Sequence, residues 1–421
     1  MKDLITRLDP ELQHLLARAA TLAADVDTTL WLVGGVVRDL WLELPIGRDI
    51  DLAAEGDINQ LIAPLADAWD GTITARHPAF GTATITVGQW VIDLAQTRTE
   101  RYPKPAALPE VQPAPLTQDL YRRDFSINAM AVQIIADGDQ LLPSPLIDPL
   151  GGVADLAARR LRLLHDQSLR DDPTRLLRGV RLAARLQLTP DAATAAQIAD
   201  ALEAGYLALL SPERIQTELC LTLEEPDPAA VIALADEWSL TPHVIPGLHW
   251  TPALAERLSR YRQDTNGIAR LVTDGLVIAG LVLYDLSDDE LTHVLHRYHL
   301  PAPARNLIQD LIALRPHIAT IAAATSPSAI DTLLQPYSIA ALAVLHYATE
   351  TSIQQVVSRY LHEWRPLRPP LNGDDLRHLG VPTGPQIGQL LRRLRTATLD
   401  GLITDRTTAE QWVRRHLADS G

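Results

Sequence analysis

The chain has 421 residues, 47% of them hydrophobic, which is enough for about two to four domains with sizeable buried cores. It has no run of about 18 uncharged apolar residues and its N-terminus lacks a signal-peptide pattern, so we expect a cytoplasmic protein without membrane spans. A single cysteine, Cys220, excludes internal disulfides and a cysteine zinc site. The net charge of −15 taken alone argues against a nucleic-acid partner, but arginine carries nearly all the positive charge and is clustered.

The most informative segment is WLVGGVVRDLWLELPIGRDIDLAAEGD, residues 31–57. A hydrophobic strand runs into Gly34-Gly35, and a second strand carries Asp49 and Asp51 on one face, because strand side chains alternate. Two neighbouring carboxylates repel each other unless a cation lies between them, and hard oxygen ligands suit Mg²⁺ together with substrate phosphates. The glycines let backbone N–H groups approach a triphosphate. A lone D-x-D is more simply a turn and a solvated strand end, but the Gly-Gly upstream favours the metal site.

Short strands dominate the first ~150 residues. We expect strands at 30–35 and 48–54, a hairpin in TATITVGQWVIDLAQT that turns at Gly88-Gln89, and further short strands within 130–136 and 140–147. No long helix separates one strand from the next, so the sheet is expected to be antiparallel or mixed. The hairpin carries Asp93, a candidate third carboxylate at the metal; the alternative is an ordinary strand-end acid.

The segment LYRRDFSINAMA, residues 120–131, combines paired arginines with Asp124 and Asn128. On a helix, Asp124 and Asn128 would share one face. Arginines of this kind suit triphosphate or ribose contacts. The alternative is a salt-bridged helix start.

From about residue 153 the pattern becomes helical. In DDPTRLLRGVRLAARL, residues 171–186, we expect Asp172, Arg175 and Arg178 to share one helix face, where a carboxylate and guanidinium groups can hydrogen-bond the edge of a base. The alternative is a surface ion pair worth only ~0.3–0.5 kcal/mol. A second arginine cluster, at residues 392–395, is either a phosphate-binding surface or a solvated helix face.

These motifs together resemble one family. GGVVRD, GRDIDLA, RRDFSINAMA, DPLGG, DDPTRLLRGVRLAARL and SPERIQTEL follow in the order and spacing of the class II tRNA nucleotidyltransferases, which include the CCA-adding enzymes and their poly(A) polymerase relatives. The resemblance covers residues ~28–220. The segment from PPLNGDDLRHLG to the C-terminus is similar to the tail of many bacterial members, whereas 225–365 matches only in being helical.

The resemblance implies an α+β protein with a polymerase-β-like head containing a mixed or antiparallel sheet, followed by an elongated helical remainder. The expected parts are a nucleotidyltransferase head at 1–152, a neck at 153–225, a body at 226–365 and a tRNA-binding tail at 366–421. Carried over by position, Asp49 and Asp51 are the catalytic metal ligands, and Glu213, Arg214 and Glu218 give structural support. The expected nucleotide-binding residues are Gly34, Gly35, Arg38, Asp39, Arg123, Asp124, Asn128, Asp172, Arg175 and Arg178, and the expected RNA-binding residues are Arg392, Arg393 and Arg395.

The implied activity is addition of C, C and A to the 3′ end of tRNA from CTP and ATP, with Mg²⁺ as cofactor and no obligate protein partner. Alternatives are an enzyme that adds only A or only CC, a poly(A) polymerase, or an inactive RNA-binding protein. The Pro-rich stretch RTERYPKPAALPEVQPAPL, residues 98–116, occupies the place of the family's specificity loop and argues against a CC-only enzyme. One departure is Asp171-Asp172, where the family usually has Glu-Asp.

Overall fold

The computed structural model describes residues 4–264 and 267–418. The chain divides into two compact units, the first ending at Val244 and the second beginning at Ile245. The predicted four-part division at residues 152, 225 and 365 stays a prediction.

A seven-stranded mixed sheet forms the centre of the first unit, with strand order β11-β8-β1-β2-β5-β4-β3. β2 and β5 pair in parallel, and the other neighbours pair antiparallel, as the sequence predicts for a mixed sheet. The strands are β1 (Thr29–Val33), β2 (Asp49–Glu55), β3 (Thr72–His77), β4 (Thr82–Val87), β5 (Trp90–Gln96), β8 (Ala131–Gln133) and β11 (Leu146–Ile147).

The predicted β4–β5 hairpin forms and turns at Gly88, whose φ of +53° favours glycine. Two features differ from expectation. β3 was not predicted, and the Pro-rich stretch forms a second hairpin from β6 (Arg98–Arg101) and β7 (Glu110–Pro113). We call residues 98–113 the pocket hairpin. A small pair, β9 (Ala136–Asp137) and β10 (Gln140–Leu141), completes the strands of this region.

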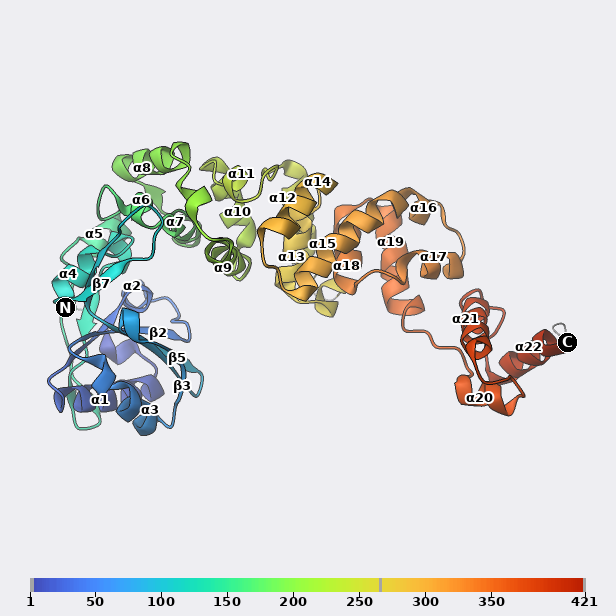
Figure 1. The fold of residues 1–421 in the computed structure, drawn as a ribbon, viewed down its shortest axis with the longest axis horizontal. Helices are drawn as coiled ribbons and strands as arrows, with labels where there is room; N and C mark the ends of the chain where they lie inside the picture. Colours follow the sequence, from blue (N-terminus) through green and yellow to red (C-terminus); the bar gives the residue numbers. More distant parts are fainter. Residues whose placement is uncertain (1–3, 265–266, 419–421) are drawn as a thin grey trace. The chain divides into compact units, whose positions relative to one another are not determined.

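Helices cover both faces of the sheet. α1 (Pro10–Ala24) and α3 (Ile62–Trp69) contact each other on one side of the strands, and α2 (Gly35–Trp41) lies on the other (Figure 1). The indole Nε1 of Trp69 donates to the Leu15 carbonyl at 2.8 Å, which ties α3 to α1. Ile50 of β2 is fully buried. The residues directly before and after it therefore point to the opposite face of the sheet, where the candidate site lies.

The rest of the first unit is mainly helical, as predicted. Its helices are α4 (Leu116–Tyr121), α5 (Gly152–Ala157), α6 (Ser168–Asp171), α7 (Thr174–Leu186), α8 (Ala192–Glu203), α9 (Pro212–Leu223), α10 (Pro228–Glu237) and α11 (Thr241–Val244). α7 contacts both α9 and α10, and all three helices are labelled in Figure 1. Two short strands, β12 (Arg160–Leu161) and β13 (Thr189–Pro190), pair in parallel within this helical region.

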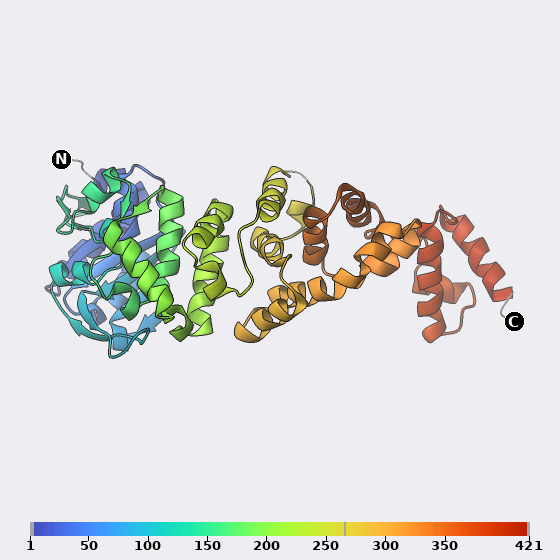
Figure 2. The ribbon, with the colours of Figure 1, turned by 90° about the horizontal axis from the view of Figure 1, so that it is seen from above.

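The described part of the second unit, yellow to red in Figure 2, contains helices and no strands. They are α12 (Pro252–Gln263), α13 (Asp274–Leu283), α14 (Asp288–Arg297), α15 (Ala302–Leu314), α16 (Ile318–Ala323), α17 (Pro327–Leu334), α18 (Ile339–Ala348), α19 (Thr351–Arg359), α20 (Gly373–His378), α21 (Pro385–Leu399) and α22 (Arg406–Ala418). Leu376, Leu394 and Val413 form the shared core of the last three helices. Within the described ranges no single helix has the length and apolar composition for crossing a membrane. Counted as one segment, α17 and α18 have that length and composition, but the two helices are sharply bent relative to each other.

Candidate active site

Three carboxylates lie together on the face of the sheet that carries α2. Asp49 and Asp51 occupy alternate positions of β2, and the parallel register of β2 with β5 puts Asp93 directly beside Asp51. The hydroxyl of Thr84, on β4, donates to Oδ1 of Asp93 at 2.5 Å. The sequence-predicted metal residues are therefore brought side by side.

The electrostatics of this face fit a cation. Asp51 opens on a pocket, but the protein around it excludes much of the water, and this burial raises the pKa of its carboxyl to about 6. Arg123 opposes the shift, while the negative charges of Asp93 and Asp49 add to it. Among the described residues, no group of three or more His, Cys, Asp or Glu side chains is placed so that it could hold a metal ion by itself. One or two carboxylates are enough for an ion such as Mg²⁺, which takes its remaining ligands from phosphates and water.

Gly34 shapes the edge of the site nearest these acids. It precedes α2 with φ +74° and ψ −140°, a conformation that side chains rarely adopt. A Cβ here would lie 3.1 Å from Oδ2 of Asp51 and 3.4 Å from Nη1 of Arg123. The absence of a side chain thus keeps the space between the carboxylate and the guanidinium open.

Arg38 and Asn128 connect α2 to the RRD segment. Arg38 is almost fully buried; its Nε and Nη2 donate to Asp39, at 2.8 and 3.0 Å, and its Nη1 donates to Oδ1 of Asn128 at 2.7 Å. Asn128 Nδ2 in turn donates to Oδ1 of Asp124 at 3.2 Å. Because the guanidinium of Arg38 is occupied in this way, it orients Asp39 and Asn128.

The prediction that Asp124 and Asn128 lie on one face of a helix is wrong. α4 ends at Tyr121, Phe125 is extended and bridges to Leu163, and only a single 3₁₀ turn follows at Ser126–Asn128. The two side chains still meet, through a tight turn instead of a helix face. Burial alone would raise the pKa of Asp124, but the charges of Arg178 and Arg175 and the Phe125 N–H hold it below its usual value.

Buried Asp119, which the motifs did not identify, holds the paired arginines. Its Oδ1 accepts from Arg122 Nη2 at 2.6 Å and its Oδ2 accepts from Arg123 Nη2 at 3.0 Å. Asp119 lies three and four residues before these arginines, a spacing that could have indicated the pairing. It leaves Nη1 of Arg123 directed toward Gly34.

We expected Asp172 and Arg175 to share one helix face, or else to form an ion pair. The structure shows neither arrangement. Asp172 is extended and lies before α7, where its Oδ1 accepts from the backbone N–H and hydroxyl of Thr174 at 3.1 and 2.6 Å and from Arg214 Nη2 at 2.6 Å. Arg175 is buried and donates to Ser168 Oγ at 2.5 Å and to the Arg122 carbonyl at 2.9 Å. Arg175 therefore links α7 to the RRD segment, and Asp172 faces the pocket.

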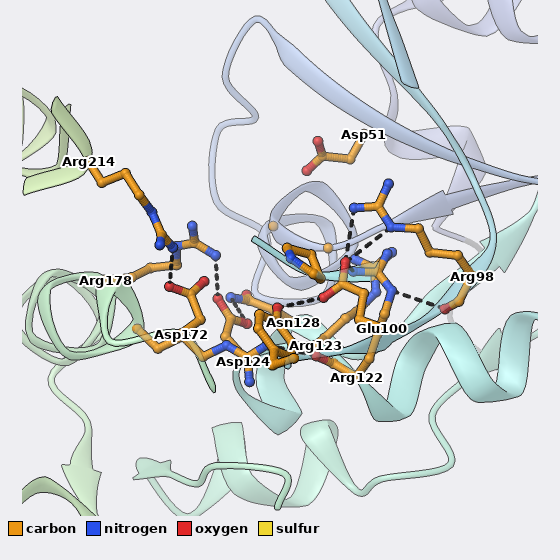
Figure 3. A pocket seen from close by; sticks show the side chains of 15 residues that line it. Asp51, Arg98, Glu100, Arg122, Arg123, Asp124, Asn128, Asp172, Arg178 and Arg214 are labelled. Carbon is orange, nitrogen blue, oxygen red and sulfur yellow. Dashed lines mark hydrogen bonds and ion pairs between the residues drawn. The ribbon is translucent and has the colours of Figure 1, made fainter. Parts of the chain in front are cut away.

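The pocket itself has a volume of about 510 Å³ and lies within the first unit. Figure 3 shows Asp51 on one side, Asp172 and Arg214 on another, and the pocket hairpin supplying Arg98 and Glu100. Glu100 is saturated: its Oε1 accepts from Arg98 and Arg122 and its Oε2 from the Tyr102 hydroxyl. The lining residues are Gly34, Gly35, Asp51, Arg98, Glu100, Tyr102, Pro109, Arg122, Arg123, Asp124, Asn128, Asp172, Arg175, Arg178 and Arg214.

The tail arginines differ from one another. Arg392 and Arg393 are exposed on α21. Arg395 instead donates to both carboxylate oxygens of Asp331, at 2.8 and 2.6 Å, and to the carbonyls of Leu367 and Trp364. Arg395 thus holds α21 against α17, a role that the arginine cluster in the sequence did not indicate.

Comparisons with known proteins show which family this chain is similar to. The family model described as the poly A polymerase head domain matches residues 30–162, and that described as the probable RNA and SrmB-binding site of polymerase A matches residues 187–251. The A-adding tRNA nucleotidyltransferase of Halalkalibacterium halodurans is 32% identical over 414 residues, covering 95% of this chain and 92% of the relative. The CC-adding tRNA nucleotidyltransferase of Deinococcus radiodurans is 43% identical over 234 residues, covering 55% of this chain and 59% of the relative.

Among solved structures, the CCA-adding enzyme of Thermotoga maritima complexed with tRNA is similar to this chain with a TM-score of 0.74 and 26% identity. The match covers 98% of this chain and 97% of that one. The fold of the whole chain, and not only the motif-bearing segment, is therefore shared.

Proposed function

This chain belongs to the tRNA nucleotidyltransferase family, and we propose that it adds C, C and A to the 3′ end of tRNA from CTP and ATP. In each transfer the terminal 3′-hydroxyl oxygen of the RNA forms a bond to the α-phosphorus, the bond from that phosphorus to the β-phosphate oxygen breaks, and pyrophosphate leaves. One observation carries the proposal: Asp51, which is suited to a metal, and groups suited to a nucleobase open on the same pocket.

Asp51 supplies the reacting end of this pocket. Asp49 and Asp51, with Asp93 beside them, are the residues that would hold Mg²⁺, which when bound favours ionisation of the 3′-hydroxyl and stabilises the departing pyrophosphate. Arg123 is anchored by Asp119 on one side and offers its other nitrogen to a triphosphate oxygen. Gly34 leaves the space that the phosphates need.

The opposite end is suited to choosing the base. Every hydrogen bond that Asp172 accepts within residues 4–264 and 267–418 falls on Oδ1, so Oδ2 can accept from the nucleotide. Cytosine and adenine each present an exocyclic NH₂ donor, whereas guanine and uracil present a carbonyl oxygen at the corresponding place. A carboxylate oxygen accepts from the first pair and repels the second, so we propose that Asp172 selects C and A without a nucleic-acid template.

The exposed tail arginines are proposed to bind the tRNA backbone. Arg392 and Arg393 lie on the solvent-exposed side of α21 and have no ion pair in the described part of the chain. Guanidinium groups placed in this way suit phosphate contacts that do not depend on sequence. We do not assign Arg395 to this RNA-binding surface, because its charge is already neutralised by Asp331.

A second candidate is an enzyme that adds only the terminal A. The observation that favours it is the A-adding relative, which matches 95% of this chain, whereas the CC-adding relative matches 55%. The presence of the pocket hairpin argues against a CC-only activity.

The test uses three RNAs: tRNA that lacks the CCA end, tRNA that ends in CC, and an unrelated RNA. Each is incubated with Mg²⁺ and CTP, ATP or both, and the product lengths are read at single-nucleotide resolution. CCA addition extends the first RNA by three nucleotides when both nucleotides are present. Extension only of the CC-ending tRNA, by ATP alone, would establish the A-adding candidate instead. Long A tracts on the unrelated RNA would indicate a poly(A) polymerase.

A further inference from the structure

A histidine in the loop between β12 and α6 contacts an arginine that lines the pocket. Nη1 of Arg175 lies 3.4 Å from Nε2 of His165 and donates to Oγ of Ser168 at 2.5 Å. We infer that His165 is a positioning residue, which holds the guanidinium of Arg175 for the nucleobase while the imidazole is neutral and displaces it when the imidazole is protonated. This inference rests on the proposed selection of the base in this pocket.

Arg175 is a buried cation whose partners are neutral. It is 4% exposed, and in the described part of the chain its guanidinium donates to Ser168, to a backbone carbonyl and to His165, and contacts no carboxylate. Asp124 also lines the pocket, but it is paired with Arg178 at 3.1 Å. A charge taken out of water needs partners, so the position of this guanidinium depends on the few acceptors that surround it.

Arg175 keeps one donor for the nucleotide. Its Nη2 carries two hydrogens, and the carbonyl of Arg122 accepts one of them at 2.9 Å. Cytosine and adenine present a ring nitrogen acceptor beside the exocyclic NH₂, whereas uracil and guanine present an N–H at the corresponding place. A donor held in the pocket therefore favours the same two bases as Asp172, provided that the guanidinium stays in place.

The contact between the two side chains requires a neutral imidazole. A guanidinium has only donors, so the Nε2 of His165 that meets it must accept, and the proton lies on Nδ1. Burial and the charge of Arg175 hold the pKa of His165 below its usual value, while the negative charges of Asp171 and Asp166 oppose this shift. The side-chain amide of Gln197, on α8, lies 3.3 Å from the His165 carbonyl and brings no charge. Protonation in mild acid would place two cations side by side.

Protonation of His165 should weaken the choice of base more than the transfer itself. Asp51 also titrates in mild acid, because burial raises its pKa to about 6. Protonation of Asp51 lowers the incorporation of every nucleotide alike, so its effect cancels in the ratio between two nucleotides. The pH dependence of that ratio therefore separates His165 from the metal-binding face.

Three variants isolate the imidazole. His165→Gln is the rescue variant, because its amide oxygen can accept from Arg175 and takes up no proton in this pH range. His165→Ala removes the acceptor and the titrating group together. The matched control is His14→Gln, since His14 is exposed on α1, on the side of the sheet opposite α2.

The measurement is kcat/KM for CTP, ATP, UTP and GTP with tRNA substrates between about pH 7.5 and about pH 5, a range that spans histidine titration. We expect the parent's preference for the correct nucleotide over UTP and GTP to fall about tenfold toward acid, equivalent to about 1.4 kcal/mol. His165→Gln should keep the parent's neutral-pH preference throughout. His165→Ala should have a lower preference that does not change with pH, and His14→Gln should follow the parent. The thermal midpoint of each protein is recorded at both ends of the range.

Three results would overturn the role of His165: a parent preference that is constant with pH, the same acidic fall in His165→Gln, or loss of that fall in His14→Gln. Nucleotide affinities measured without turnover give the same ratio for a variant that is too slow to assay. These outcomes differ from a failure of the proposed function. If the parent extends only CC-ending tRNA, the proposal of CCA addition fails, but the pH profile of the preference for ATP over UTP and GTP still tests His165.

Discussion

Replacing Gly34 by alanine tests whether the space between Asp51 and Arg123 is needed for activity. The backbone at Gly34 has φ +74° and ψ −140°, and a side chain there costs on the order of 1–3 kcal/mol. The new Cβ would lie 3.1 Å from Asp51 Oδ2 and 3.4 Å from Arg123 Nη1, so these groups must move by some tenths of an ångström. Since catalytic geometry tolerates little displacement, we expect nucleotide incorporation to fall by roughly 10- to 100-fold.

The control for this change is Gly205→Ala. Gly205 also has a positive φ, +69°, but no atom lies within 4 Å of the position its Cβ would take. It should lower stability by about 1–2 kcal/mol through the backbone alone. The assay is the initial rate of ATP incorporation into CC-ending tRNA, with the urea midpoint and the tRNA affinity measured alongside. If Gly34→Ala keeps the incorporation rate of the control, the opening between carboxylate and guanidinium is not what the site requires.

The remaining predictions concern the acids and the tail. Asp51→Ala should abolish Mg²⁺-dependent incorporation while tRNA affinity, measured by filter binding, stays near that of the parent; substantial remaining activity contradicts its role. Asp172→Asn presents an amide NH₂ as well as an oxygen, so incorporation of UTP and GTP relative to ATP should rise about tenfold or more, and an unchanged ratio leaves Asp172 as a helix cap only. Changing Arg392 and Arg393 together to Gln should flatten the log–log dependence of tRNA affinity on salt by about 1.4–1.8, whereas Arg395→Gln should lower the thermal midpoint and leave the slope unchanged. Equal slopes in all three proteins would mean that this surface does not bind RNA.

The local parts of the fold follow directly from the sequence. Alternation of apolar residues predicts β1, β2 and the β4–β5 hairpin, and the Ser-Pro start of SPERIQTEL predicts α9, which begins at Pro212 with Ser211 before it. The pocket hairpin escaped prediction because its strands are four residues each and its composition, rich in proline and charge, is typical of a loop.

Many of the residues that line the pocket could be named from the sequence, but their contacts could not. Asp93 comes beside Asp51 only through the parallel pairing of β2 with β5, a long-range choice that neither strand's sequence encodes by itself. Arg38 meets Asn128 across 90 residues, and Arg214 meets Asp172 across 42. The spacing of Asp119 from Arg122 and Arg123 could have indicated their pairing, although the sequence analysis did not use it. Spacing misled for Asp172 and Arg175, because the chain is extended before α7.

The scarcity of lysine gives this chain a practical property. Its lysines are Lys2 and Lys104, and Lys104 lies exposed in the pocket hairpin, where its carbonyl accepts from the Ala107 N–H. The single cysteine, Cys220, is exposed on α9. With Lys2 changed to Arg and the amino terminus blocked, an amine-reactive dye would report on the hairpin and a thiol-reactive dye would report on α9. Energy transfer between the two dyes would follow the hairpin as nucleotides bind, and alkaline conditions would favour the second coupling because burial raises the pKa of the Cys220 thiol.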